Sequence, residues 1–151
     1  MCIFAYGQTG SGKTHTVHGD AKNPGLAPRA VEEVCRVVAE GARKGKTSVS
    51  MTAYMLELYQ DTMNDLLLPA PTGKSGNEWS APRLDIKKDS KGWVTVQNAT
   101  VVPVRTKEDM EAAIATGLRA RATSATKMNA ESSRSHLIFS LVIETTDLQT
   151  Q

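Results

Sequence analysis

The sequence predicts an α/β fold, and three patterns carry this prediction. An apolar run at Cys2–Tyr6, with β-branched and aromatic residues, predicts a buried strand that leads directly into a glycine-rich loop. Apolar residues at helical spacing across Val31–Val38 predict the buried face of a helix. Alternation of apolar and polar residues across Leu137–Ile143 predicts a final strand.

The first half of the chain contains this helix and an interior strand. His15–Gly25 is polar and is interrupted by glycine, asparagine and proline, which predicts a loop or a broken helix. Pro28 suits the first turn of the helix that carries the Val31–Val38 stripe, and Gly41 is expected to end it. Val49–Tyr59 is rich in strand-forming residues and apolar on both faces, which predicts a strand inside a sheet.

A loop and a hairpin are expected next. Pro69–Pro82 holds three prolines and two glycines, a composition that is typical of a loop. Arg83–Asp89 and Trp93–Gln97 each alternate between apolar and polar residues, and a short glycine-containing turn separates them. This arrangement predicts a β-hairpin.

A second long helix is expected before the final strand. Thr106 followed by Asp109 resembles a capping box, in which an acidic side chain in the first turn bonds back to the helix start. Apolar residues at helical spacing continue from there to Leu118. Ala122–Arg134 is small and polar, so we expect it to form a loop.

Composition excludes several classes of function. The chain has 151 residues, is 40% hydrophobic, and carries a net charge of only +2, from 18 basic and 16 acidic residues. That balance predicts neither nucleic-acid nor membrane binding by bulk charge. Cys2 and Cys35 are too few for a disulfide framework or a zinc site, and they are expected to be buried thiols in a reducing compartment. No apolar run approaches the roughly 20 residues that a membrane helix needs, so we expect a cytoplasmic protein.

The glycine-rich loop carries the clearest chemical signal. It matches the phosphate-binding pattern G-x-x-x-x-G-K-[ST] and consists of Gly7, Gln8, Thr9, Gly10, Ser11, Gly12, Lys13 and Thr14. Glycines let the backbone N–H groups approach phosphates closely. Lys13 supplies positive charge to the β- and γ-phosphates, and the Thr14 hydroxyl is a ligand for Mg²⁺. The expected ligands are therefore ATP, or another nucleoside triphosphate, and Mg²⁺.

A second polar cluster, Asn129–His136, precedes the final strand. Its hydroxyls, amide and guanidinium suit a sensor for the γ-phosphate and Mg²⁺, which hydrolysis requires in addition to a phosphate loop. Residue types alone leave the alternative open, because asparagine and serine runs mostly form loops and helix caps. For His18 and His136 we predict structural roles, since a lone histidine is rarely catalytic.

Together the motifs resemble those of the kinesin motor family. The resemblance lies in "FAYGQTGSGKTHT" at Phe4–Thr16, "GLAPRAV" at Gly25–Val31, "ELYQDTMNDLL" at Glu57–Leu67 and "NAESSRSH" at Asn129–His136. These segments stand in the family's order and cover essentially the whole chain. The resemblance implies a P-loop NTPase fold of the kinesin motor type, with an incomplete mixed sheet flanked by helices. It also implies a microtubule-stimulated ATPase that drives microtubule-based movement in the cytoplasm, on the cytoskeleton.

The family's functional residues map onto this chain one by one. His15 is similar to the residue that packs on the adenine, and Ser133 to the switch I serine that reaches Mg²⁺. The resemblance places Ser132 by the attacking water and Asn129 against the γ-phosphate. Arg134 resembles the arginine that pairs with a glutamate of switch II.

Other parts of the family's motor domain are not found in this sequence. Residues 1–151 resemble a partial motor domain, without the N-terminal strands, switch II and the main microtubule-binding elements. The glutamate that pairs with the arginine at Arg134 belongs to that missing switch II. The resemblance therefore implies that the chain alone does not turn over ATP and is poorly stable.

Partners follow from the resemblance as well. The hairpin with Lys87, Lys88 and Lys91 resembles the family's loop that contacts acidic tubulin, although a solvated turn explains these lysines equally well. The end of the sequence, "LVIETTDLQTQ", resembles the C-terminal-motor kinesins, notably the plant calmodulin-binding type. Any homodimer would form through a coiled coil outside this chain.

Two other functions compete with an ATP-driven motor. A small P-loop kinase or GTPase fits the phosphate loop, but it does not fit the switch I resemblance, and no guanine-specifying Asn-Lys-x-Asp occurs. A non-catalytic, degenerate motor fragment that acts as a binding module stays open. The intact Lys13, Thr14, Ser133 and Arg134 speak against a decayed site, whereas the missing switch II favours one.

Overall fold

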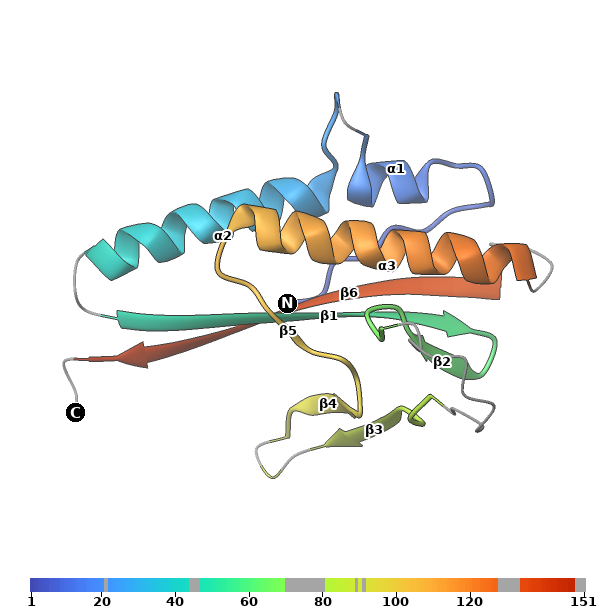
Figure 1. The fold of residues 1–151 in the computed structure, drawn as a ribbon. Coiled ribbons are helices and arrows are strands. Elements are labelled where there is room, and N and C mark those ends of the chain that lie inside the picture. Colours follow the sequence, from blue (N-terminus) through green and yellow to red (C-terminus); the bar gives the residue numbers. More distant parts are fainter. Residues whose placement is uncertain are drawn as a thin grey trace.

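A computed structural model describes residues 1–20, 22–43, 47–69, 81–88, 90, 92–127 and 134–148. Three helices and six strands lie in these ranges, and Figure 1 shows their arrangement. In chain order they are α1 (Lys13–His18), α2 (Leu26–Arg43), β1 (Thr47–Tyr59), β2 (Thr62–Asp65), β3 (Asp85–Lys88), β4 (Val94–Gln97), β5 (Val102–Pro103), α3 (Lys107–Lys127) and β6 (Ser135–Asp147). Two helices thus come first, five strands follow, and a helix and a strand complete the order.

Strand β1 is the centre of the main sheet. Strand β6 pairs with it along its whole length, from Thr47 opposite Asp147 to Tyr59 opposite Ser135. The other edge of β1 carries β2 near one end and β5 near its middle. The prediction of an interior strand is confirmed. Every pairing among the described strands is antiparallel, so the parallel pairs of a mixed sheet are not found in this part of the chain.

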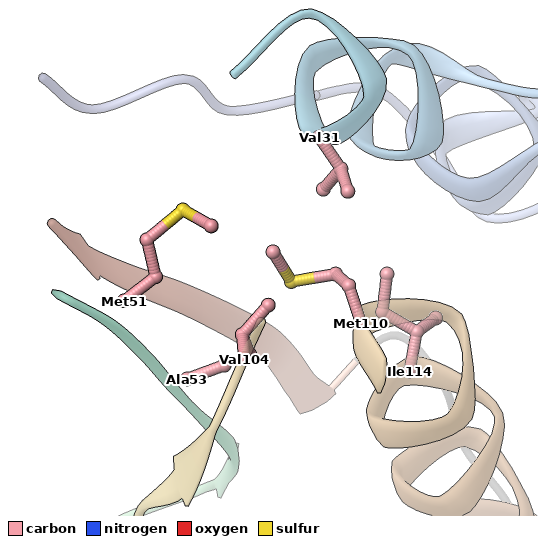
Figure 2. Close-up of a cluster of buried hydrophobic side chains, with 6 residues drawn as sticks. All are labelled: Val31, Met51, Ala53, Val104, Met110 and Ile114. Atoms are coloured by element: carbon pink, nitrogen blue, oxygen red, sulfur yellow. The ribbon is translucent and has the colours of Figure 1, made fainter. Parts of the chain in front are cut away.

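The core lies between the sheet and its helices. All three helices lie on the same side of β1 and β6 in Figure 1. Figure 2 shows how one cluster forms there, with side chains from α2, β1, α3 and the end of β5 pointing toward one another. Its buried members are Val31, Met51, Ala53, Val104, Met110 and Ile114. A second cluster, of Met55, Leu66 and Leu67, continues the core along β1.

The capping box predicted at the start of α3 is confirmed. The Asp109 carboxylate accepts hydrogen bonds from the backbone N–H groups of Arg105 and Thr106, at 2.9 and 3.0 Å. The Thr106 hydroxyl accepts one in return from the Asp109 N–H, at 3.2 Å. These bonds favour the charged carboxylate, and they lower the pKa of Asp109.

The strand predicted at Cys2–Tyr6 is absent. Residues 1–7 are irregular, and Phe4 and Tyr6 are 76% and 86% exposed. The prediction of a buried thiol is wrong for Cys2, which is exposed on this segment, whereas Cys35 is partly buried. A strand needs a neighbour to bond its N–H and C=O groups, and no described strand lies beside this segment. The phosphate-binding motif is therefore entered from an irregular segment.

Both long helices extend further than the sequence indicates. Helix α2 continues through Gly41 to Arg43, so this glycine does not end it. Helix α3 includes residues 122–127, which we expected in a loop. Within this extension the Thr123 hydroxyl donates to the Arg119 carbonyl one turn earlier, at 3.0 Å, a bond that a threonine side chain makes inside a helix.

The predicted hairpin is confirmed as β3 paired with β4, and it forms a sheet of its own. All four residues of β3 are exposed, as are Trp93 and Val94. Pro69–Pro82 was predicted as a loop, and most of it, residues 70–80, lies outside the described ranges. Among the described helices, none combines the length and apolar character that a bilayer crossing requires.

Candidate functional site

The glycine-rich loop has the compact shape that phosphate binding requires. Within it the Ser11 N–H donates to the Gln8 carbonyl at 3.2 Å, which closes a turn. Gly12 then caps α1 in the left-handed region, with φ of 88°, and its carbonyl accepts the first helical bond from the Thr16 N–H at 2.8 Å. Only glycine adopts this conformation without strain, so the motif's second invariant glycine has a direct physical reason here.

Lys13 lies over this loop. Its ammonium group donates to the carbonyl oxygens of Gly7 and Gln8, at 2.7 and 2.8 Å. These bonds hold a positive charge beside the backbone that would surround the phosphates. The placement fits the role that the sequence predicts for Lys13, a cation for phosphate oxygens.

The loop also leaves room for a ligand. A Cβ placed on Gly10 or Gly12 would meet no atom within 4 Å, so the space beside the backbone is open at both positions. A cleft of about 1420 Å³ lies beside the loop and is lined by Gly10, Gly12 and Lys13. Thr14, which is exposed and follows Lys13 on α1, lines it too. The residues present therefore fit nucleotide phosphates, with the Thr14 hydroxyl available to a Mg²⁺ ion.

His15 occupies the next position on α1 and also lines the cleft. Its Nε2 lies 3.4 Å from Asp20 Oδ2, and both side chains are mostly exposed. The other carboxylate oxygen of Asp20 accepts the N–H groups of Lys22 and Asn23, each at 2.8 Å. These backbone bonds are the main cause of the lowered pKa of Asp20. The adenine contact of His15 stays a prediction.

The structure describes the second polar cluster only from Arg134 onward. Asn129, Ser132 and Ser133 lie outside the described residues. Arg134 is described, and its carbonyl accepts a hydrogen bond from the Gln60 N–H at 3.1 Å. This contact puts the end of the cluster beside the turn that follows β1.

Sequence reasoning missed a buried charged pair next to this point. The Arg121 Nε donates to Glu57 Oε1 at 3.0 Å, and Arg121 Nη2 donates to the Ser135 hydroxyl at 2.7 Å. We call these three residues the Arg121 clamp. Glu57 is only 7% exposed. The sequence did contain a signal for this pair. Glu57 is the one charged residue in the predicted interior strand Val49–Tyr59, and a buried carboxylate requires a cation.

His18 lies at the end of α1 and lines the same cleft as the Arg121 clamp. Its Nδ1 is buried and has no hydrogen-bond partner among the described residues. Burial, and secondarily the positive charge of Arg121, lower the pKa of His18 from its ordinary value of 6.5. The folded protein therefore favours the neutral imidazole.

This lowered pKa predicts that stability falls in acid. Above pH 6.5, His18 is neutral in both states and contributes no pH dependence. As the pH falls below 6.5, the unfolded chain takes up a proton that the folded chain resists, so the free energy of unfolding decreases. The decrease ends once folded His18 is protonated too. Urea unfolding at several pH values between 7.5 and 5 measures this decrease, and the free energy of unfolding should fall less with pH in His18→Asn than in wild type.

Comparison with known proteins identifies the family. The model of the kinesin motor domain matches residues 1–151. The chain belongs to the kinesin motor family. Kinesin-like protein KIN-14I of Oryza sativa subsp. japonica is 53% identical over the whole chain, and kinesin-like protein KIN-14E of Arabidopsis thaliana is 52% identical. The chain spans 11% of the length of each.

A solved kinesin structure agrees with this assignment. The structure titled "Structure of a fast kinesin: Implications for ATPase mechanism and interactions with microtubules" matches with a TM-score of 0.81 and 30% identity, over 97% of this chain and 39% of that one. The kinesin fold and family predicted from the motifs are thus confirmed. Kinesins are microtubule motors and ATPases, and their motor fold implies nucleotide binding.

Proposed function

We propose that this kinesin chain binds Mg·ATP through Gly7–Thr14 and supplies the phosphate-binding part of a microtubule motor. The observation that carries this proposal is the position of Lys13 over the loop, at 2.7 and 2.8 Å from the carbonyls of Gly7 and Gln8. When phosphates bind, their oxygens would replace those carbonyls as acceptors. The exchange strengthens the bonds, because the new acceptors are charged.

Catalysis by this site would be mainly electrostatic. Lys13 and the loop N–H groups would bind the phosphate oxygens on which negative charge grows during in-line attack of water. Bound Mg²⁺, held by the hydroxyls of Thr14 and Ser133, would neutralise further charge on the β- and γ-oxygens. For the water-side roles we propose Ser132 and Asn129, with Arg134 beside them, on the strength of the kinesin motif alone.

Equilibrium binding tests the nucleotide part of this proposal. Titration of the chain with ATP should show one site, and binding should weaken when EDTA removes Mg²⁺. Phosphate release is then measured with and without microtubules. Binding without release is the result expected both of a partial motor domain and of a non-catalytic binding module, whereas release that microtubules accelerate supports the motor. Absence of any ATP binding at millimolar concentration would overturn both.

For the partner we propose microtubules, contacted through the β3–β4 hairpin. Both Lys87 and Lys88 are exposed on β3, and the hairpin stands apart from the main sheet. Lys91 lies outside the described residues and is included by sequence position only. A cytoskeletal location in the cytoplasm, and a homodimer through a coiled coil outside residues 1–151, belong to the same proposal.

Charge reversal on the hairpin provides the matching test. The double substitution Lys87→Glu and Lys88→Glu should weaken co-sedimentation with microtubules about tenfold, because like charges would then face acidic tubulin. The variant should lose much of the salt dependence that the wild type shows. Lys22→Glu combined with Arg43→Glu makes the same change in net charge at exposed positions outside the hairpin and serves as the control. Equal losses in both variants would remove the hairpin from the interface.

A further inference from the structure

The Arg121 clamp joins three elements that are distant in sequence. Arg121 is 64 residues from Glu57 and 14 residues from Ser135, so it connects α3 to the main sheet strands β1 and β6. The side chains of Arg121 and Glu57 are 20% and 9% exposed. A buried ion pair persists only where its geometry is good, and here the 3.0 Å bond meets that condition.

The guanidinium group makes this connection rigid. Its nitrogens lie in one plane, so the bond from Nε to Glu57 fixes the direction in which Nη2 points. That second nitrogen donates to the Ser135 hydroxyl at 2.7 Å. The buried carboxylate thereby aims the arginine at the first residue of β6.

Ser135 is the first residue of β6. It stands opposite Tyr59 in the terminal pair of the β1–β6 ladder, where strands fray most readily. The bond from Gln60 N–H to the Arg134 carbonyl is the adjacent backbone contact. The clamp and this contact together fix the point at which the polar cluster joins β6.

We propose that Arg121 is a positioning residue that holds the Arg134–Ser135 end of the polar cluster in place for γ-phosphate recognition. This inference rests on the proposed ATP-binding function. Arg121, Glu57 and Ser135 line the same cleft as the phosphate loop. Most contacts of that loop would be to the α- and β-phosphates, which ATP and ADP share. The clamp would act through the polar cluster, whose expected ligand is the γ-phosphate that ADP lacks.

The ratio of ATP to ADP affinity tests the proposal, because general damage to the fold lowers both affinities together. Ser135→Ala removes one arm of the clamp and leaves the Glu57–Arg121 pair. Arg121→Lys keeps the positive charge beside Glu57 but loses the planar fork. Each should lower the ATP to ADP affinity ratio about threefold to tenfold, the effect of one hydrogen bond. Thr145→Ala, an exposed hydroxyl near the far end of β6, should keep the wild-type ratio.

The possible results distinguish a failure of the proposed ATP binding from a failure of the positioning role of Arg121. If wild type binds neither nucleotide, the proposed function fails, and the inference fails with it. If wild type binds both and the two clamp variants keep its ratio, the function stands and the positioning role is wrong. Parallel losses of ATP and ADP affinity, accompanied by a lower melting temperature, would also contradict the inference, since they reveal a merely structural pair.

Discussion

Replacing Lys13 with alanine is expected to weaken ATP binding about a hundredfold or more. The ammonium group would make charge-assisted bonds to phosphate, each worth about 1.5–3 kcal/mol, and about 1.4 kcal/mol corresponds to a factor of ten. Among the described residues Lys13 bonds to the carbonyls of Gly7 and Gln8 and belongs to neither core cluster, so its loss should leave the folded core intact. Titration of wild type and variant with Mg·ATP measures the change.

Two further variants make this result specific. Lys22→Ala removes a lysine from the turn beyond α1 and should bind ATP as wild type does. Lys13→Arg keeps the charge but replaces a compact ammonium by a wider, planar group, so its affinity should also fall. Equal affinity in wild type and Lys13→Ala would show that the loop does not bind phosphates.

The second large effect is expected in the core, at Gly117. This helical residue packs against Met55, which is fully buried, and a Cβ at position 117 would collide with the Met55 sulfur. Gly117→Val should therefore lower the free energy of unfolding by about 3 kcal/mol through overpacking. Urea unfolding of the two proteins measures the difference.

A matched control distinguishes overpacking from helix propensity. Ala115→Val places the same side chain on an exposed position of α3 and should cost at most about 0.7 kcal/mol. Adding Met55→Ala to Gly117→Val should recover part of the loss, because the two side chains compete for one space. If Gly117→Val and Ala115→Val unfold alike, the close contact with Met55 is not real.

The elements that sequence predicts well are those whose pattern is long and local. Strand β1 is recognisable from Val49–Tyr59 because its apolar residues suit both faces of a buried strand. The start of α3 is recognisable because its cap is made by two neighbours, Thr106 and Asp109. Strand β5, by contrast, has two residues, too few for a period to show, and the four residues of β2, Thr62–Asp65, include a single apolar side chain, so they show no alternation.

Two predictions of secondary structure were wrong, the first for a tertiary reason and the second for a local one. Cys2–Tyr6 has strand-forming residues, but a strand is completed by its neighbour, and none is described beside it. Small polar residues after Ala122 do not exclude a helix, since such residues are only weakly unfavourable there.

The candidate site shows the same division between local and distant features. The phosphate loop is one continuous segment, so its residues and their roles could be predicted together. The Arg121 clamp combines positions 57, 121 and 135, which only the folded chain brings into contact. A buried acid in β1 indicates that a partner exists, but it does not indicate which arginine provides it.

Amide NMR spectra recorded during a Mg·ATP titration show residue by residue whether Gly7–Thr14 binds the phosphates of ATP. We expect the largest saturable shifts at the backbone N–H groups of these residues, and we expect Lys13→Ala to abolish them at the same concentrations. Shifts that leave this loop untouched, or that persist unchanged in Lys13→Ala, would contradict this binding.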